Sequence, residues 1–303
     1  MEISAKILTP EDDFISRNIE DYPEGIIIPI NKPYRWTSAD VIRKVKYAAI
    51  RHFGKKNLKV GHAGTLDPLA TGVLLVCIGK ATKLAEELQS HDKEYVAGVT
   101  FGATTPSYDL EKEIDRFFPH EHISAETVSE ALPGFLGEQD QVAPLFSAKS
   151  VDGVRAYELA RKLHKEGKTL DEAAQELIRT ARINISGLEL LTFEGGSGCG
   201  LQDNPSHFVG PSPCGQGGST VLQAAATSAS SRINVTDNSA LGLPRAVIRM
   251  ACSKGTYVRA FARDLGEALG SGAHLDSLQR SRSGIFHVGN ALTVEQAVQK
   301  LGV

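Results

Sequence analysis

Segment 61–72 combines a carboxylic acid with residues that build a tight loop. It reads Gly-His-Ala-Gly-Thr-Leu-Asp-Pro-Leu-Ala-Thr-Gly, with Asp67 near its middle, and the apolar run Val73–Ile78 follows directly. Glycine permits backbone conformations that other residues resist, and the proline after Asp67 biases the acid away from helix. The pattern predicts a loop that holds one carboxylate, a potential nucleophile or base, at the start of a buried strand. A plain Asp-Pro turn is the alternative.

The segment resembles the catalytic motif of the TruB family of tRNA pseudouridine synthases, Gly-His-x-Gly-Thr-Leu-Asp-Pro-x-Ala-Thr-Gly. All ten fixed positions match, and a chance match is of order 10⁻¹³ at about one in twenty per position. The resemblance implies the α+β pseudouridine synthase fold, with a central mixed, mostly antiparallel sheet flanked by helices and loops. It also implies an isomerase that converts the T-loop uridine of tRNA, conventionally position 55, to pseudouridine, with Asp67 as the catalytic carboxylate.

Two further segments resemble active-site motifs of the same family. Asp-Lys-Glu-Tyr at 92–95 resembles the segment that carries the active-site tyrosine. Tyr95 would stack on the extruded uracil and take part in proton transfer. Gly-Thr-Tyr-Val-Arg at 255–259 resembles the motif Gly-Thr-Tyr-x-Arg, which implies that Arg259 pairs with the catalytic aspartate and that Tyr257 lines the pocket. Without the resemblance, Tyr95 is a half-buried strand residue and Arg259 pairs with an acid on its own helix.

Three more residues are assigned to substrate binding by the resemblance. Segment 272–281 resembles the family's Gly-Ala-His…Leu-x-Arg segment, and its Leu278 would pack against the target base. The family counterpart of His62 helps to fill or reorganise the space left by the flipped nucleotide. Asp109 lines up with an aspartate in a more variable family region, which assigns it to binding of the target uridine. The sequence departs from the family pattern at position 35. The family's Lys-Pro pair is retained as Lys32-Pro33, but Arg35 stands where glycine is usual.

A basic stretch lies directly before the Asp67 loop. The whole chain has 303 residues and a net charge of −3, which by itself argues mildly against a nucleic-acid partner. Positions 41–60, however, hold seven basic residues and no acid. Basic surface beside a site attracts phosphates even when the total charge is negative. We expect backbone contacts to RNA from Arg43, Lys44, Lys46, Lys55, Lys56 and Lys59; a solvated helix face is the alternative.

Composition bounds the remaining possibilities. The chain is 41% hydrophobic and 23% charged, as in globular proteins, and it has no apolar run that could span a bilayer. No secretory signal is visible, and the four cysteines lack close spacing, so a cytoplasmic protein with no metal site is expected. The isomerisation transfers no electrons, so no cofactor is expected either.

The elements that must position the motifs follow from the pattern around them. Thr37–Asp40 offers caps for a helix that Gly54 ends, and Ala246–Cys252 predicts a strand before a helix that starts near Val258. Residues 1–24 are predicted to form an N-terminal tail and 25–303 the catalytic domain. Positions 194–242 contain only four charged residues and many glycines and serines, which indicates a flexible low-complexity insertion.

The resemblance leaves two alternative functions open. One is an RNA-guided relative of the dyskerin type, and the other is a tRNA-folding or tRNA-binding protein without catalysis. The resemblance favours a monomer that acts on the T-arm of tRNA without a guide RNA or a membrane. A complete C-terminal PUA domain, present in many relatives, is expected to be absent.

Overall fold

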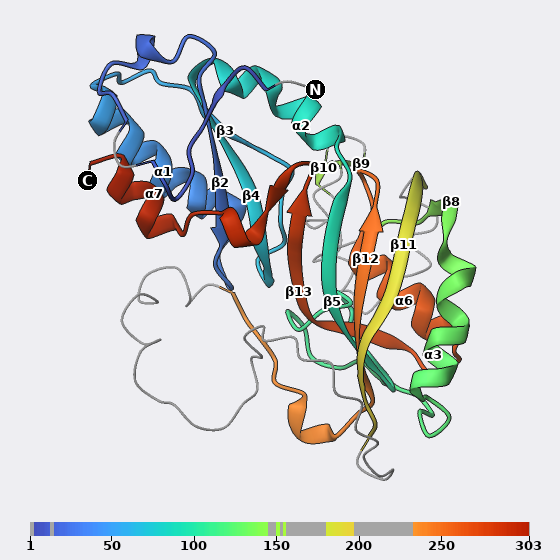
Figure 1. Cartoon of the computed structure of the whole chain (residues 1–303). Helices are drawn as coiled ribbons and strands as arrows, with labels where there is room; N and C mark the ends of the chain where they lie inside the picture. Colours follow the sequence, from blue (N-terminus) through green and yellow to red (C-terminus); the bar gives the residue numbers. More distant parts are fainter. Residues whose placement is uncertain are drawn as a thin grey trace.

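The protein is built around one ten-stranded sheet (Figure 1). The computed structural model describes residues 3–12, 15–144, 150–151, 154–155, 180–196 and 233–302. The strand order is β1 (Lys6–Ile7), β2 (Ile26–Lys32), β4 (Ala70–Ile78), β13 (Ala273–Ser283), β5 (Lys93–Phe101), β12 (Arg245–Cys252), β11 (Ala181–Glu194) and β8 (Gly137–Gln141), with β3 (Val60–Ala63) paired to β4 and β14 (Phe286–His287) to β13.

Most strand pairs of this sheet are antiparallel. The exceptions are β1 with β2 and β4 with β13, which run parallel. Two short hairpins stand apart, made of β6 (Ala103–Thr104) with β7 (Arg116–Phe117) and of β9 (Ser150–Val151) with β10 (Val154–Arg155). The mixed, mostly antiparallel sheet with helices around it confirms the predicted α+β class.

The helices pack around the sheet. The described α-helices are α1 (Ser38–Phe53), α2 (Ala85–Ser90), α3 (Ala125–Ala131), α6 (Val258–Ala268) and α7 (Val294–Lys300). Short 3₁₀ turns occur at Ile19–Asp21, Gly79–Leu84, Leu132–Phe135, Ser239–Leu241 and Val288–Asn290. Figure 1 shows α1 and α7 beside β2 and β4, and α6 and α3 near β12, β11 and β8 at the other end of the sheet. In the described ranges, no helix is long and apolar enough to cross a membrane.

Helix α1 begins and ends as its sequence predicts. The Thr37 hydroxyl accepts a hydrogen bond from the Asp40 backbone N–H, and the Asp40 carboxylate accepts one from the Thr37 backbone N–H, which completes a capping box. Gly54 ends the helix in the left-handed conformation, with φ of 60°. Val41 and Val45 lie on the face that packs into the main core. The local signals therefore fix where α1 starts, and its first residue, Ser38, contacts the Asp67 loop at Leu66.

Strand β4 is buried on both faces, as its uninterrupted apolar run predicts. Leu74 and Val76 pack into the main core with α1, α6 and α7, whereas Val73 and Leu75 pack into a second cluster with Leu88 of α2. Successive side chains of a strand point to opposite faces, so a strand covered on both sides must be apolar throughout. The strand that follows Asp67 is thus a rigid central element of the fold.

The segment predicted as an N-terminal tail is packed rather than free over its described residues. Strand β1 pairs with β2, and Leu8 and Ile15 are buried in the main core. The apolar residues of this segment are widely spaced among acids and show no periodicity in the sequence. In the structure, Leu8 and Ile15 nevertheless pack into the main core. Of the predicted insertion at 194–242, residues 197–232 lie outside the described residues. Ile233 and Thr236, near its far end, are bound to the domain by hydrogen bonds.

Candidate active site

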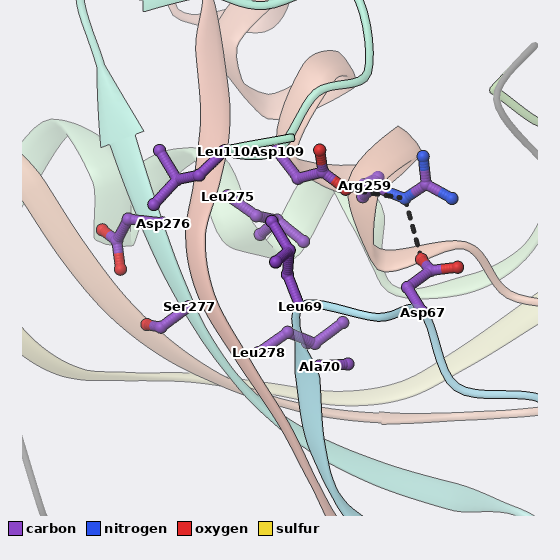
Figure 2. Close-up of a pocket in the computed structure, with 10 residues that line it drawn as sticks. All are labelled: Asp67, Leu69, Ala70, Asp109, Leu110, Arg259, Leu275, Asp276, Ser277 and Leu278. Atoms are coloured by element: carbon purple, nitrogen blue, oxygen red, sulfur yellow. Dashed lines mark hydrogen bonds and ion pairs between the residues drawn. The ribbon is translucent and has the colours of Figure 1, made fainter. Parts of the chain in front are cut away.

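Asp67 lies in the loop between β3 and β4, at the edge of a pocket (Figure 2). Its side chain is 39% exposed. Its Oδ2 accepts a hydrogen bond of 2.9 Å from Nε of Arg259, drawn as a dashed line in Figure 2. Among the described residues, Arg259 alone hydrogen-bonds this carboxylate. The second oxygen, Oδ1, is therefore available to a substrate in the pocket.

Arg259 brings a buried positive charge to the carboxylates. It lies in the first turn of α6, is 5% exposed, and also donates from Nη1 to the Ser107 carbonyl at 3.1 Å. Its Nε lies 3.7 Å from Oδ2 of Asp109. Burial disfavours the charged guanidinium, but Asp67 and Asp109 outweigh burial and raise the pKa of Arg259 above its ordinary value. Asp264, an acid on the same helix, is bound by Arg263 instead.

The pocket is polar at its two ends and apolar between them. It is lined by Asp67, Leu69, Ala70, Asp109, Leu110, Arg259, Leu275, Asp276, Ser277 and Leu278. Figure 2 shows Asp67 and Arg259 at one side, Asp276 and Ser277 at the other, and leucines between them. Four predicted site residues, Asp67, Asp109, Arg259 and Leu278, are thus brought together. Every lining residue that sequence reasoning missed lies within three positions of one of these four.

Asp276 is the missed residue with the largest set of contacts. It lies where the β13–β5 register shifts, and such bulges redirect side chains. Arg245 donates to both of its oxygens, at 2.7 and 2.9 Å, and Thr100 donates at 2.8 Å. Burial raises the pKa of Asp276, but Arg245, Ser277 and Thr100 together lower it below its ordinary value. Gly98 leaves room for the Asp276 carboxylate, because a Cβ at position 98 would lie 2.2 Å from Asp276 Oδ1. Arg245 and Asp276 are 31 residues apart in the chain, so the sequence alone did not predict that they pair.

The other predicted active-site residues, Tyr95, His62 and Tyr257, do not line this pocket. Tyr95 is 9% exposed on β5, directly opposite Arg280 of β13. Burial raises the pKa of the Tyr95 hydroxyl, and the Arg280 charge opposes that rise. His62 lies on β3, where burial and Arg280 lower its pKa. Tyr257 precedes α6, and its backbone N–H and carbonyl bind the side chain of Gln141.

The Asp67 loop is anchored by two further buried cations. The Lys32 ammonium donates to the carbonyls of Pro33, Trp36 and Pro68, at 3.0, 2.6 and 3.2 Å. These three acceptors match its three N–H groups. Burial nevertheless disfavours the charge and lowers the pKa of Lys32 to about 7.

Arg280 closes the loop at its ends. Its Nε donates to the Val73 carbonyl at 2.7 Å and its Nη2 to the Gly64 carbonyl at 3.0 Å, so one side chain joins residues on either side of Asp67. The backbones also approach closely here. A Cβ on Gly72, which has φ of 99°, would lie 2.2 Å from the Arg280 carbonyl oxygen. Only glycine fits at this position, which explains the last residue of the loop motif.

Arg35 is an unusual residue beside the same loop. Its φ is 62°, in the left-handed region that glycine adopts readily. Its backbone N–H donates to the Pro68 carbonyl at 3.0 Å, and its Nη2 donates to the Ile233 carbonyl at 2.9 Å. The family's glycine at this position thus has a conformational reason, and the arginine here adds a side-chain contact.

The predicted basic residues are exposed on α1 and the turn after it. Arg43 forms an ion pair with Asp40, and Lys55 forms one with Glu20. Arg51 lies over the ring of Tyr47, which is 60% exposed. All six predicted RNA-contact residues, namely Arg43, Lys44, Lys46, Lys55, Lys56 and Lys59, face solvent. Their exposure is compatible with phosphate contacts and also with a simple solvated face.

Comparison with known proteins finds similar sequences along most of the chain. Residues 51–195 match the family model of the TruB family pseudouridylate synthase N-terminal domain, and residues 259–301 match that of the tRNA pseudouridylate synthase B C-terminal domain. A tRNA pseudouridine synthase B of Phocaeicola vulgatus is 44% identical over 275 residues, covering 91% of this chain and 92% of the relative. That of Bacteroides thetaiotaomicron is 46% identical with the same coverage, and that of Thermus thermophilus 37% identical, covering 90% of this chain and 79% of the relative.

Solved structures of low sequence identity share the fold. A chain of a Cbf5–Nop10–Gar1 complex matches with a TM-score of 0.51 and 22% identity over 93% of this chain and 56% of that chain. A chain of an archaeal box H/ACA sRNP Nop10–Cbf5 complex matches with a TM-score of 0.52 and 19% identity over 99% and 64%. This chain therefore spans less than two thirds of those chains, and at such identities the likeness shows the fold alone.

Proposed function

Since this chain belongs to the TruB family of pseudouridine synthases, and is therefore an isomerase, we propose that it converts the T-loop uridine of tRNA at position 55 to pseudouridine, with Asp67 as the catalytic carboxylate. One observation carries the assignment of Asp67. Its carboxylate is partly exposed at the edge of a leucine-lined pocket, with one oxygen bound by the buried Arg259 and the other available.

The reaction rearranges bonds within one nucleotide. The N1–C1′ glycosidic bond breaks, the uracil turns, and C5 bonds to C1′; the proton on C5 is then lost and N1 carries a proton. The ionised carboxylate of Asp67 can act at the ribose in two ways, by attack on C1′ or by removal of the C2′ proton. Arg259 holds Oδ2 in either case, so Oδ1 is the reacting atom in this proposal.

The pocket offers a place for an extruded base. Flipping a base out of folded RNA costs a few kcal/mol. Leu69, Leu110, Leu275 and Leu278 supply apolar surface that offsets part of that cost when the base enters. Asp109 and Ser277 supply polar atoms to the lining. Tyr95, Tyr257 and His62 remain part of the proposal as residues that meet the nucleotide once RNA is bound.

The proposed partner is the T-arm of tRNA. Arg43, Lys44 and Lys46 lie on the helix whose first turn abuts the Asp67 loop, so phosphates bound there lie on the approach to the site. The proposal has the enzyme act as a monomer without a guide RNA, in the cytoplasm where tRNA is found. It also keeps residues 25–303 as one catalytic domain that an insertion at 194–242 interrupts.

Tritium release and site mapping on one tRNA transcript test this function. The purified full chain, without any added guide RNA, is expected to release tritium from [5-³H]uridine-labelled tRNA and to leave one pseudouridine at position 55. A matched transcript with cytidine at position 55 is expected to give no release. Activity that requires a guide RNA would indicate the dyskerin-type alternative. Binding of tRNA without any release would indicate the non-catalytic alternative.

A further inference from the structure

A buried serine at the start of α1 is bonded to the residue before Asp67. Ser38 is 3% exposed. Its Oγ donates to the Leu66 carbonyl at 3.2 Å and accepts from the Leu66 N–H at 3.0 Å. The hydroxyl is not needed as a helix cap, because Thr37 already accepts from Asp40 in that role. Its hydrogen bonds therefore serve the loop.

The two bonds fix both peptide groups around Leu66. The N–H belongs to the peptide before Leu66, and the carbonyl belongs to the peptide that joins Leu66 to Asp67. The Leu66 side chain is itself buried in the main core, 4% exposed. The backbone from which Asp67 extends is thus held by one hydroxyl and by core packing. Because few torsions separate that peptide from the carboxylate, its orientation sets where Oδ1 points.

Asp67 is consequently held from two sides by helices that are far apart in sequence. Ser38 of α1 fixes its backbone, and Arg259 of α6 fixes its carboxylate tip. With the hydroxyl removed, two buried polar groups of Leu66 lose their partner, and the loop shifts to satisfy them. Arg259 can still reach the carboxylate, but from a changed angle. A misplacement of about 1 Å at a reacting group costs on the order of 100-fold in rate.

We propose that Ser38 is a positioning residue of the reaction, which orients the Asp67 carboxylate through the Leu66 peptides. The inference rests on the proposed catalytic role of Asp67. It predicts a loss in turnover rather than in RNA binding, because Ser38 is buried and does not line the pocket.

The test compares Ser38→Ala with Thr37→Ala, which also removes one hydroxyl from the same helix end. Thr37 exchanges hydrogen bonds with Asp40, and among the described residues none of its side-chain hydrogen bonds reaches the loop, so its loss weakens α1 alone. Both variants are expected to lower the melting temperature by similar amounts. Ser38→Ala is expected to lower kcat by about 10- to 100-fold with KM for tRNA within about threefold, whereas Thr37→Ala keeps kcat within about twofold.

A second variant separates positioning from simple loosening. Ser38→Thr restores a hydroxyl at this site and is expected to recover kcat to within about fivefold of wild type. Equal kcat in Ser38→Ala and Thr37→Ala, or a Ser38→Ala defect confined to KM, overturns the role of Ser38. A fully active Asp67→Asn variant overturns the proposed function itself. An inactive Asp67→Asn beside a fully active Ser38→Ala overturns only the inference about Ser38.

Discussion

Two regions hold the Asp67 loop by different interactions. One runs from Lys32 at the end of β2 to Ser38 at the start of α1, and is called the β2–α1 segment here; the other is the first turn of α6. The first uses Lys32, the Arg35 N–H and the Ser38 hydroxyl, and each of these groups forms a hydrogen bond with the backbone of the loop, at Pro68 or Leu66. The second uses Arg259, which binds the Asp67 carboxylate itself. One region fixes the shape of the loop, and the other meets the group proposed to react.

The β2–α1 segment mainly sets the geometry of the loop, whereas Arg259 acts on the charge of the Asp67 carboxylate. Backbone groups do not titrate, so Arg35 and Ser38 can fix the loop through its backbone without altering the carboxylate directly; within this segment, Lys32 also interacts electrostatically with Asp67. Arg259 places a permanent positive charge between Asp67 and Asp109, so its removal leaves two acids close together without their shared partner. Variants of the β2–α1 segment should therefore change the geometry and stability of the loop, whereas variants of Arg259 should change the charge at the reacting carboxylate.

The largest effect is expected for Asp67→Asn, which keeps the size of the reacting side chain but removes its charge. Pseudouridine formation should fall by about 10³-fold or more, since an amide is neither a useful nucleophile nor a base. Affinity for tRNA should change little. Site-specific pseudouridine mapping and filter binding on the same transcript measure both quantities. Full turnover by this variant would contradict the assignment.

Arg259→Ala should come next, and should lower rate more than RNA affinity. The loss of a charged partner at a reacting carboxylate is expected to cost about 10²- to 10³-fold in kcat. Arg259→Lys is the matched control, since it keeps the charge but not the fork that also reaches the Ser107 carbonyl. Equal losses in binding and rate would point to a phosphate-contact role for Arg259 instead.

Lys32→Met tests the β2–α1 segment, through the pH dependence of the free energy of unfolding. Burial lowers the pKa of Lys32 to about 7, so above that pH unfolding takes up a proton. The free energy of unfolding of the wild type should therefore rise with pH relative to Lys32→Met. The slope is up to about 1.4 kcal/mol per pH unit between about pH 7 and pH 10.

Urea unfolding at about pH 6 and about pH 9 measures this difference for the wild type and Lys32→Met. The variant should lie closest to the wild type at the lower pH. Arg259→Ala serves as the control that separates the two regions. Because Arg259 stays charged throughout this window, its variant should show no such divergence. A constant gap between the wild type and Lys32→Met would show that Lys32 does not titrate there.

The smallest effect is expected at Arg35, where backbone strain and a side-chain contact oppose each other. Arg35→Ala loses the Ile233 contact and keeps the left-handed φ, whereas Arg35→Gly loses the contact and relieves the strain. The glycine variant should be the more stable of the two by about 1 kcal/mol. Chemical unfolding of both variants checks this. Greater stability of the alanine variant would mean that φ is not positive at this position.

Local signals predicted those parts of the fold that short segments decide. The capping box and terminal glycine of α1, and the doubly buried β4, follow from neighbouring residues. The N-terminal segment was predicted wrongly as a tail, because Leu8 and Ile15 show no periodicity and gain burial only from distant elements. Asp276 was missed for a similar reason: its partner Arg245 lies on another strand.

By itself the sequence determined the loop that carries Asp67, its glycine-dependent shape and, through the family motif, the residues to place beside it. Only the tertiary structure decided which groups hold that loop. Lys32, Ser38, Arg259 and Arg280 reach it from four separate elements. A hydrogen bond between residues far apart in the chain leaves no periodic trace in the sequence, because it depends on where the sheet and its helices place both partners.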